Sequence, residues 1–437
     1  MKFAIWLFIF IFIVAGSYVI LSVELPYWSP AVSAVSIILT ACPAIWAAAR
    51  WLGRRDAFIL FAGLAILGLT IETFAIITGA PYGHFGYSDL LGHQLFGYTP
   101  WTVAFAWPPL VLAAYAVSGS ILSGPVFRVA AAAIILTAAD LVLDPGAVRL
   151  GFWQYDSGGA FYGVPLSNFA GWLLSGALGA LLLEAFVYWR KPLLPIPSQL
   201  VLSGLLSLVF WTAIATFSGM AAPAVLGACL TAGLAVFYIK YHYAFDDMIV
   251  IVDEDNNPIR TERKLKAHDH DTALHRAFSV FLFNQQGELL LQQRALTKKT
   301  WPGVWSNSCC GHVMLHEKVK SAAQRRLRHE LGYRGIELFE ILPDYRYRAE
   351  KDGVVENEIC PVFIGFTNGQ PKPRSEEVND YRWMDWNSFL EEIRSGQSGY
   401  SPWAVEEVEL LAVDQEFCRL FEANTGQALD HQVKMAA

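Results

Sequence analysis

The chain has 437 residues, of which 54% are hydrophobic and 16% are charged. Residues 1–240 hold only 9 of the 32 Lys and Arg and 8 of the 39 Asp and Glu, so the charge is concentrated in residues 241–437. The first part therefore has the composition of a membrane protein and the second that of a soluble domain. The acidic second part argues against nucleic acid as a partner, and six cysteines are too few for a disulfide framework.

The first part predicts an all-α polytopic membrane domain. A bilayer core of about 30 Å requires about 20 apolar residues per helix. Eight runs of suitable length occur, at 3–22, 29–49, 56–78, 99–118, 126–144, 167–189, 198–217 and 219–240. With the amino terminus inside, eight Lys and Arg lie at cytoplasmic ends and only Arg149 lies opposite. We expect about eight transmembrane helices in the cell inner membrane, with both termini cytoplasmic. The first run also fits a cleaved signal peptide, which would leave seven spans.

Acidic residues inside the apolar runs are candidates for a function, because charge is costly in lipid. They are Glu72, Asp140, Asp144 and Glu184. The alternating direction of the spans puts Glu72, Asp140 and Asp144 toward the non-cytoplasmic side, and the two Asp share a helix face through their i, i+4 spacing. We expect these three carboxyl groups to share one pocket. The alternative is an interfacial aromatic belt in which Asp144 caps a helix end.

Two loops beside these acids carry a family resemblance. The segments PYGHFGY and DLVLDPGAVRLGFWQYDSGGAFYGVPLSNFAGW resemble the CruF-type carotenoid hydratases, which are integral membrane proteins. The resemblance covers about residues 55–240 and implies addition of water across the terminal double bond of an acyclic carotenoid end. Protonating an isolated alkene requires an acid, and a carboxyl group in apolar surroundings stays protonated, which suits Glu72, Asp140 or Asp144. Related membrane proteins cyclise or extend the same end group, and an inert membrane anchor is a further alternative.

The second domain, residues 241–437, reads as an α/β fold. MIVIVDEDNNPI and AFSVFLFNQQGELLLQQRA predict β-hairpins, and EKVKSAAQRRLRHELG predicts a helix that ends at Gly332. This loop and helix fit the Nudix pattern in part, but Arg326 and His329 replace two of its three clustered glutamates. Those glutamates bind Mg²⁺ in Nudix hydrolases, so their loss indicates a diphosphate substrate that is not cleaved. A membrane-tethered Nudix diphosphatase is the alternative.

Five segments then resemble the type I isopentenyl-diphosphate isomerases in order and spacing: HRAFSVFLFN, RALTKKTWPGVWSNSCCGH, PDYRYRA, VVENEICPVF and YSPWAVEE. The resemblance covers about residues 245–410. It implies that one divalent metal, Mn²⁺ or Zn²⁺, has the ligands His268, His275, His312, Glu356 and Glu358. It implies further that Cys310 and Glu358 are the catalytic pair and that Glu330 binds the Mg²⁺ on the diphosphate. Tyr347 and Trp403 would line the pocket, and the basic residues around the diphosphate would be Lys264, Arg294, Lys298 and Arg326.

The chemistry of such an isomerase explains these residue types. Converting isopentenyl to dimethylallyl diphosphate adds a proton at the terminal alkene carbon and removes one nearer the diphosphate, so an acid and a base must act in a dry pocket. If the loop were read one residue off, Cys309 would replace Cys310; the spacing to His312 selects Cys310. Other polar residues near the motifs are expected on the solvated surface: His270, His316, His329, Glu337, Glu340 and the run 376–380.

Overall fold

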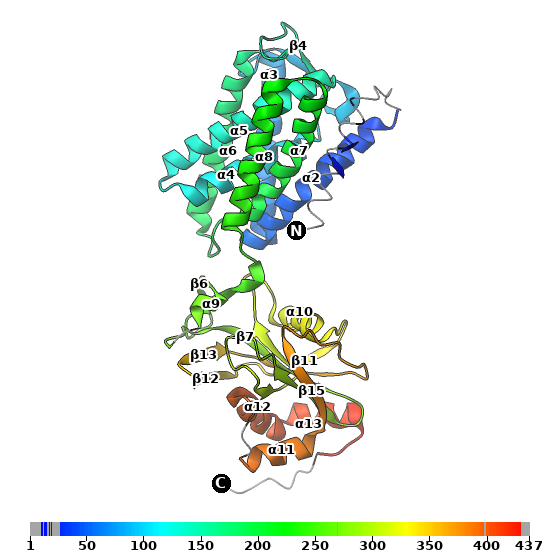
Figure 1. Ribbon diagram of the computed structural model, residues 1–437, viewed down its shortest axis with the longest axis vertical. Coiled ribbons are helices and arrows are strands. Elements are labelled where there is room, and N and C mark those ends of the chain that lie inside the picture. The colour runs from blue at the N-terminus through cyan, green and yellow to red at the C-terminus, as the bar shows by residue number, and fades with distance from the viewer. Residues whose placement is uncertain are drawn as a thin grey trace. The chain divides into compact units, whose positions relative to one another are not determined.

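The computed structural model describes residues 10, 11, 13, 14, 17, 19, 27–268, 270–396 and 399–429. The contacts divide the chain between Tyr243 and Ala244 into two compact units, and each unit is described by itself. Figure 1 follows both units in chain order, from blue at the amino terminus to red at the carboxyl terminus.

The amino-terminal unit is a bundle of apolar helices (Figure 1). They are α2 (Ser29–Leu52), α3 (Arg54–Thr78), α4 (Val103–Ile121), α5 (Pro125–Arg149), α6 (Leu166–Arg190), α7 (Val201–Phe217) and α8 (Ala221–Tyr241). Seven described helices are long and apolar enough to cross a membrane, and they correspond to the last seven predicted runs. The run 3–22 lies largely outside the described residues. An eighth span is therefore not among the described helices.

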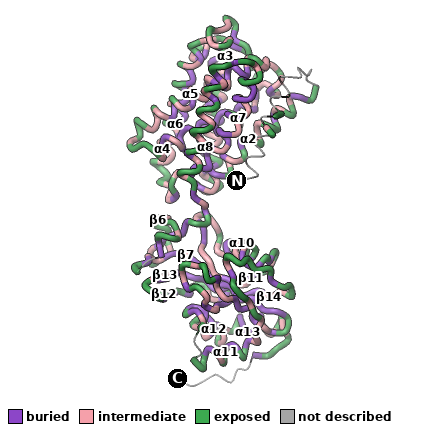
Figure 2. The backbone as a smooth tube through the Cα atoms, in the orientation of Figure 1, coloured by how far each residue is buried: buried purple, intermediate pink, exposed green. Residues whose placement is uncertain are grey.

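Large apolar side chains on these helices face outward. Phe58, Ile66 and Phe74 of α3 are all exposed, and so is Ile239 of α8. Figure 2 shows such exposed positions in green along the outer helices of this unit. A soluble protein rarely exposes so much contiguous apolar surface, whereas lipid would cover it. The bundle is therefore built for an apolar surrounding.

The two aromatic loops of this unit form a small sheet between helices. Strand β1 (Phe85–Tyr87) pairs antiparallel with β4 (Trp153–Tyr155), so that Phe85 lies opposite Tyr155 and Tyr87 opposite Trp153. Nearby lie a 3-10 turn and a second pair of strands: η1 (Asp89–Leu91), β2 (Gln94–Leu95) and β3 (Thr99–Pro100). The sequence predicted only loops here, because strands of two or three residues leave no readable alternation.

Helix α5 does not end where the sequence suggested. The predicted span stopped at residue 144, but the helix continues through Pro145 to Arg149. Within this last part of the helix, Gly146 lets α5 pack closely on α7, because a Cβ there would lie 2.8 Å from the Trp211 ring. Asp144 is thus inside the helix, and the interpretation of it as a helix cap is wrong.

The carboxyl-terminal unit is an α/β domain with one large sheet. Its strands are β5 (Met248–Val252), β6 (Pro258–Arg263), β7 (His275–Phe283), β8 (Glu288–Arg294), β9 (Trp305–Ser306), β10 (Cys309–His312), β11 (Leu338–Leu342), β12 (Arg346–Lys351), β13 (Val354–Ile359), β14 (Val362–Phe366) and β15 (Val378–Asp385). The helices are α9 (Lys264–Ala267), α10 (Val319–Leu331), α11 (Trp386–Arg394), α12 (Pro402–Val413) and α13 (Gln415–Thr425), with the turn η3 (Phe245–Asp247) at the start. Both predicted hairpins are confirmed, as β5–β6 and β7–β8.

Strand β7 runs through the centre of the sheet and divides the core into two layers. Its side chains alternate: Phe281 and Phe283 join the cluster that includes α11, α12 and α13, whereas Val280 and Leu282 join the cluster that includes α10. Helix α10 therefore covers one face and the three last helices the other (Figure 1). Gly332 ends α10 in the left-handed conformation, at φ 77°, as predicted.

Candidate functional site

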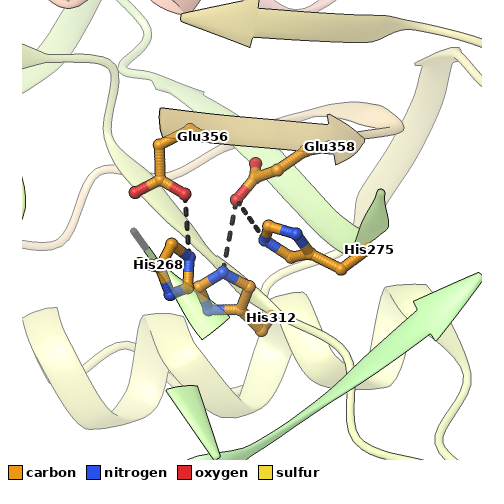
Figure 3. Close-up of side chains that lie close together, drawn as sticks. All are labelled: His268, His275, His312, Glu356 and Glu358. Carbon is orange, nitrogen blue, oxygen red and sulfur yellow. Dashed lines mark ion pairs between the residues drawn. The ribbon is translucent and has the colours of Figure 1, made fainter. Parts of the chain in front are cut away.

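Three histidines and two glutamates meet near the start of β7 in the large sheet (Figure 3). His268 follows α9, His275 begins β7 and His312 ends β10. Glu356 and Glu358 stand two residues apart on β13, so both point to the same face of the sheet. The parallel pairing of β13 with β7 sets Glu358 directly beside His275. One ligand atom from each of the five residues lies within 4.8 Å of all the others.

The hydrogen bonds of the imidazole rings fix which nitrogens face the carboxylates. His268 Nδ1 lies 2.7 Å from the Lys264 carbonyl oxygen, and His275 Nδ1 lies 2.9 Å from that of Ala273. A carbonyl oxygen only accepts, so each Nδ1 carries the hydrogen and each Nε2 of the neutral ring presents a lone pair. This second-sphere arrangement is typical of histidines that bind a metal.

The facing atoms approach closely without satisfying one another. His268 Nε2 lies 2.9 Å from Glu356 Oε2, while His275 Nε2 and His312 Nε2 lie 3.3 and 3.2 Å from Glu358 Oε1. None of the three nitrogens has a hydrogen bond. Buried polar atoms are normally paired, and lone pairs directed at carboxylate oxygens leave room for a cation between them. The set of nitrogen and oxygen ligands therefore fits a divalent metal, with no preference between Mn²⁺ and Zn²⁺.

The charges in this cluster suit ligation as well. Burial opposes ionisation of Glu358, but His275 and His312 hold its pKa well below the usual range. Burial, together with nearby Lys264, keeps the pKa of His312 well below its usual value. An ionised carboxylate and a neutral imidazole are the forms that bind metals.

Cys310 and Cys309 face opposite sides of the sheet, because neighbours on a strand alternate. Cys310 packs beside the aromatic residues of the α11–α13 layer, and its Sγ donates to Asn307 Oδ1 at 3.0 Å. Cys309 is fully buried in the α10 layer, where its Sγ lies 3.5 Å from Glu330 Oε2. Burial raises the pKa of Cys310 to about 12, so this thiol carries its proton at neutral pH.

Aromatic rings line the space next to Glu358. Tyr347 lies opposite Glu358 across β12 and β13, and its hydroxyl donates to Glu358 Oε2 at 2.8 Å. The rings of Tyr347 and Trp403 have centroids 5.5 Å apart, and Trp301 is 5.4 Å from Trp403. The predicted pair Tyr347 and Trp403 is thus joined by Trp301, which the sequence did not single out. The only sign of Trp301 in the sequence was its position directly before a proline in a loop that contains glycine.

The four predicted basic residues gather close together, next to two acids. Lys298 Nζ lies 2.8 Å from Glu377, and Arg326 forms ion pairs with both Glu377 and Glu330. Burial and then Arg326, Lys298 and Arg294 lower the pKa of Lys264 to about 8. Burial opposes ionisation of Glu377, but Lys298 and Arg326 lower its pKa to about 2. So many cations in a partly buried place are suited to an anion with several charges.

Glu377 corrects one sequence expectation. The run 376–380 was predicted to be solvated surface, but the Glu377 side chain is only 18% exposed and contacts two of the four cations. Sequence could not show this, because the ion pairs join segments far apart in the chain. Glu330 lies in this basic region and is not one of the five clustered residues, so any metal that it binds would be a second one.

Glu407 was not predicted at all. It is fully buried on α12, and its Oε2 accepts from Ser279 Oγ at 2.7 Å. Ser279 lies opposite Cys310 in the pairing of β7 with β10. Burial raises the pKa of Glu407 well above its usual range. A signal existed in the sequence: Glu407 is four residues after Trp403, so a helix puts both on one face.

Three acids of the amino-terminal unit, Glu72, Asp140 and Asp144, accept hydrogen bonds from neutral side chains. Tyr87 donates to Glu72 at 3.0 Å, and Tyr155 donates to Asp144 at 2.8 Å. The Asn168 amide donates to Asp140 at 2.8 Å and also to Asp144. All three carboxyl groups are buried.

Glu184 is in a different environment from these three acids. It forms an ion pair with Arg128 and accepts from Tyr115 at 2.8 Å. Glu184 therefore has a partner of opposite charge, whereas Glu72, Asp140 and Asp144 form no ion pair with any described residue.

The carboxyl-terminal unit is an α/β domain with a buried cluster of histidines and glutamates that fits a divalent metal, and a family model described as NUDIX domain matches residues 273–404. A family model described as carotenoid biosynthesis protein matches residues 31–234. Three curated relatives of the carboxyl-terminal part are named isopentenyl-diphosphate Delta-isomerase. That of Saccharopolyspora erythraea is 46% identical over 163 residues, which is 37% of this chain and 84% of the relative. Those of Frankia alni and Klebsiella pneumoniae are both 44% identical, and the matches cover 37% of this chain and 84% and 88% of the relatives. Through this part the chain belongs to the isopentenyl-diphosphate Delta-isomerase family.

Proposed function

We propose that the carboxyl-terminal unit interconverts isopentenyl and dimethylallyl diphosphate. The observation that carries this proposal is the arrangement of Cys310 and Glu358 around β7, beside a wall of buried aromatic rings. Relatives that bear the isomerase name support the same reaction.

Two proton transfers make up the reaction, and this chain has a group for each. A proton is added to the terminal alkene carbon, and another is removed from the carbon nearer the diphosphate. Cys310, as a neutral thiol, and Glu358, as an ionised carboxylate, form an acid–base pair for these transfers. Tyr347 orients Glu358 through its hydroxyl group. The Trp403 face stabilises developing positive charge by about 1–2 kcal/mol in a desolvated pocket.

The metal requirement follows from the ligands. His268, His275, His312, Glu356 and Glu358 would hold Mn²⁺ or Zn²⁺, which when bound fixes the ligands and balances their charge. Glu330 would bind Mg²⁺ together with the diphosphate.

The basic residues bind the diphosphate, and the site lacks the acids that would hydrolyse it. Lys264, Arg294, Lys298 and Arg326 supply four positive charges to a diphosphate. Arg326 and His329 stand where a Nudix hydrolase has glutamates, and Arg326 pairs with Glu330, so the acid cluster that would activate water is reduced to one member. This supports isomerisation over the diphosphatase alternative.

The purified full chain should interconvert the two five-carbon diphosphates when Mg²⁺ and Mn²⁺ or Zn²⁺ are supplied. Products are separated by chromatography, and free phosphate is measured in the same samples. Release of phosphate or monophosphate without isomerisation would instead show that the domain is a diphosphatase.

For the amino-terminal unit we propose hydration of an acyclic carotenoid end at a multi-pass membrane site, with the carboxyl-terminal domain in the cytoplasm. The match to carotenoid biosynthesis proteins and the three buried acids support it. An inert anchor would have no need for such acids, which are costly in an apolar surrounding.

Expression of the full chain in lycopene-producing cells tests this second activity. The Cys310→Ala chain is included, so that added isoprenoid supply does not account for the products. We expect a tertiary alcohol of lycopene with both chains. Unchanged lycopene in both would favour the anchor alternative.

A further inference from the structure

A large apolar cavity opens inside the amino-terminal unit, within the described residues. Its volume is about 670 Å³, and it is lined mainly from α2, α4 and α7, with Glu72 of α3, Leu143 of α5, Trp172 of α6, the β1–β4 sheet, and Phe10, Ile11 and Val14. Tryptophans contribute much of the wall: Trp107, Trp153, Trp172 and Trp211. The cavity therefore offers aromatic faces to whatever occupies it.

Glu72 is the only acidic residue among the described residues that line the cavity. It is 7% exposed, and Tyr87, which also lines the cavity, donates a hydrogen bond to it. No Lys, Arg or His belongs to the described wall. The Glu72 carboxyl group thus faces an apolar space that has no cation in its described wall. Because an unpaired buried charge is costly, this site favours the protonated form of Glu72.

Asp140 and Asp144 lie close enough to Glu72 for their charges to interact with it, but their contacts differ from those of Glu72. Neither lines the cavity. The Asn168 amide of α6 bonds to both of them on α5, and Tyr155 of β4 bonds to Asp144. These contacts join α5, α6 and β4, and the second oxygen of Asp140, which accepts no hydrogen bond, belongs to a residue outside the cavity wall.

We propose that Glu72 is the proton donor of the amino-terminal unit, that the cavity holds the terminal isoprene unit of a neutral acyclic polyene, and that Asp140 and Asp144 serve structure alone. This inference rests on the proposed hydratase function and chooses among its three candidate acids.

The occupant follows from the wall of the cavity. An isoprenoid diphosphate would bring several negative charges next to Glu72, where the described wall has no basic residue to receive them. A neutral hydrocarbon end matches the apolar lining. The aromatic rings suit the tertiary cation that forms after protonation, because ring faces attract positive charge.

The reaction balances with water as the only co-reactant. The Glu72 proton is added to the CH carbon of the terminal double bond, and the positive charge is left on the dimethyl carbon. The oxygen of a water molecule bonds to that carbon, and the water proton returns to the Glu72 carboxylate. The net change is addition of one water.

The test uses the full chain in lycopene-producing cells, with hydroxylated product measured per amount of membrane-inserted protein. Glu72→Gln keeps size and hydrogen bonding but carries no acidic proton, so product should fall at least about 100-fold. Glu72→Asp, the matched control, should restore part of it. Asp140→Asn and Asp144→Asn should each keep at least about a tenth of the parent product while the thermal unfolding midpoint falls.

A second variant tests the cavity without touching the acid. Ser207 lines the cavity on α7, and Ser207→Trp should fill it and stop product formation. The control Ile66→Trp changes an exposed residue of α3 outside the cavity and should leave product formation unchanged.

The outcomes separate this inference from the hydratase proposal. A parent chain that makes no hydroxylated product overturns the hydratase proposal itself. A parent that is active together with an equally active Glu72→Gln overturns the role of Glu72 and leaves hydration standing. Full activity of Ser207→Trp would overturn the cavity assignment.

Discussion

The two units of this chain bury acidic residues in contrasting ways. In the carboxyl-terminal unit, Glu358 faces two histidines, and Glu377 faces Lys298 and Arg326. In the amino-terminal unit, Glu72 accepts a hydrogen bond from Tyr87 and forms no ion pair with any described residue. Cationic partners keep a carboxylate ionised, as Lys298 and Arg326 do for Glu377 and as a metal ion held by the histidines would do for Glu358, whereas a neutral donor leaves room for the proton. The first arrangement suits binding of cations and general base catalysis, and the second suits delivery of a proton.

The largest expected effect in this comparison concerns the two adjacent cysteines. Cys310→Ala should lower isomerisation about 10²–10⁴-fold, because it removes one of the two proton-transferring groups. Cys309→Ala should keep most of the rate, because its thiol faces the α10 layer. Steady-state rates of both purified variants are the measurement; equal losses would show that the site does not distinguish the two faces of β10.

Removal of a metal ligand should have the next largest effect. His275→Ala should lower both the amount of bound transition metal and the isomerase rate. Each loss should exceed the about 10–100-fold that is typical when a residue outside the ligand set is changed. His270→Ala is the control, because His270 is exposed and outside the five-residue cluster. Elemental analysis of the purified chains gives the metal content. Parent-like metal content in His275→Ala would contradict the assigned ligand set.

Tyr347→Phe should have an intermediate effect. A hydrogen bond to a charged group contributes about 1.5–3 kcal/mol, so loss of the bond to Glu358 should slow isomerisation about 10- to 100-fold. The ring remains to pack against Trp403, so folding should be unaffected. If the rate is unchanged while the variant folds, Tyr347 does not orient Glu358.

The smallest effect is expected for stability at Glu377. Its folded pKa of about 2 is below the usual carboxyl value, so its ion pairs stabilise the fold above about pH 4.5, and this contribution is lost as the pH falls toward 2. Glu377→Gln should therefore cost about 1–2 kcal/mol at pH 7 and almost nothing near pH 2. Thermal unfolding of parent and variant across this pH range measures the difference, and a gap that stays constant would contradict the assigned ion pairs.

The sequence predicted what is local or carried by a motif. Apolar runs of membrane length gave the seven described helices, and the turns at Asn256 and Gly287 gave both hairpins. Gly332 marked the end of α10 because a left-handed residue there favours glycine.

What the sequence missed depends on tertiary contacts. Glu377 looked like a surface acid until Lys298 and Arg326 were brought to it. Glu407 needed the register of α12 against β7 to become a buried neighbour of Ser279. The choice among the three membrane acids needed the cavity, since spacing alone treats Glu72, Asp140 and Asp144 alike.

The central claim is that one chain holds two chemically independent sites, and one paired assay tests it most directly. Isomerase rate and carotenoid hydroxylation are both measured for the parent, Cys310→Ala and Glu72→Gln in the full-length protein. Cys310→Ala should lose isomerisation and keep hydroxylation, and Glu72→Gln should show the reverse. Loss of both activities in either correctly inserted variant, or retention of both, would contradict the account.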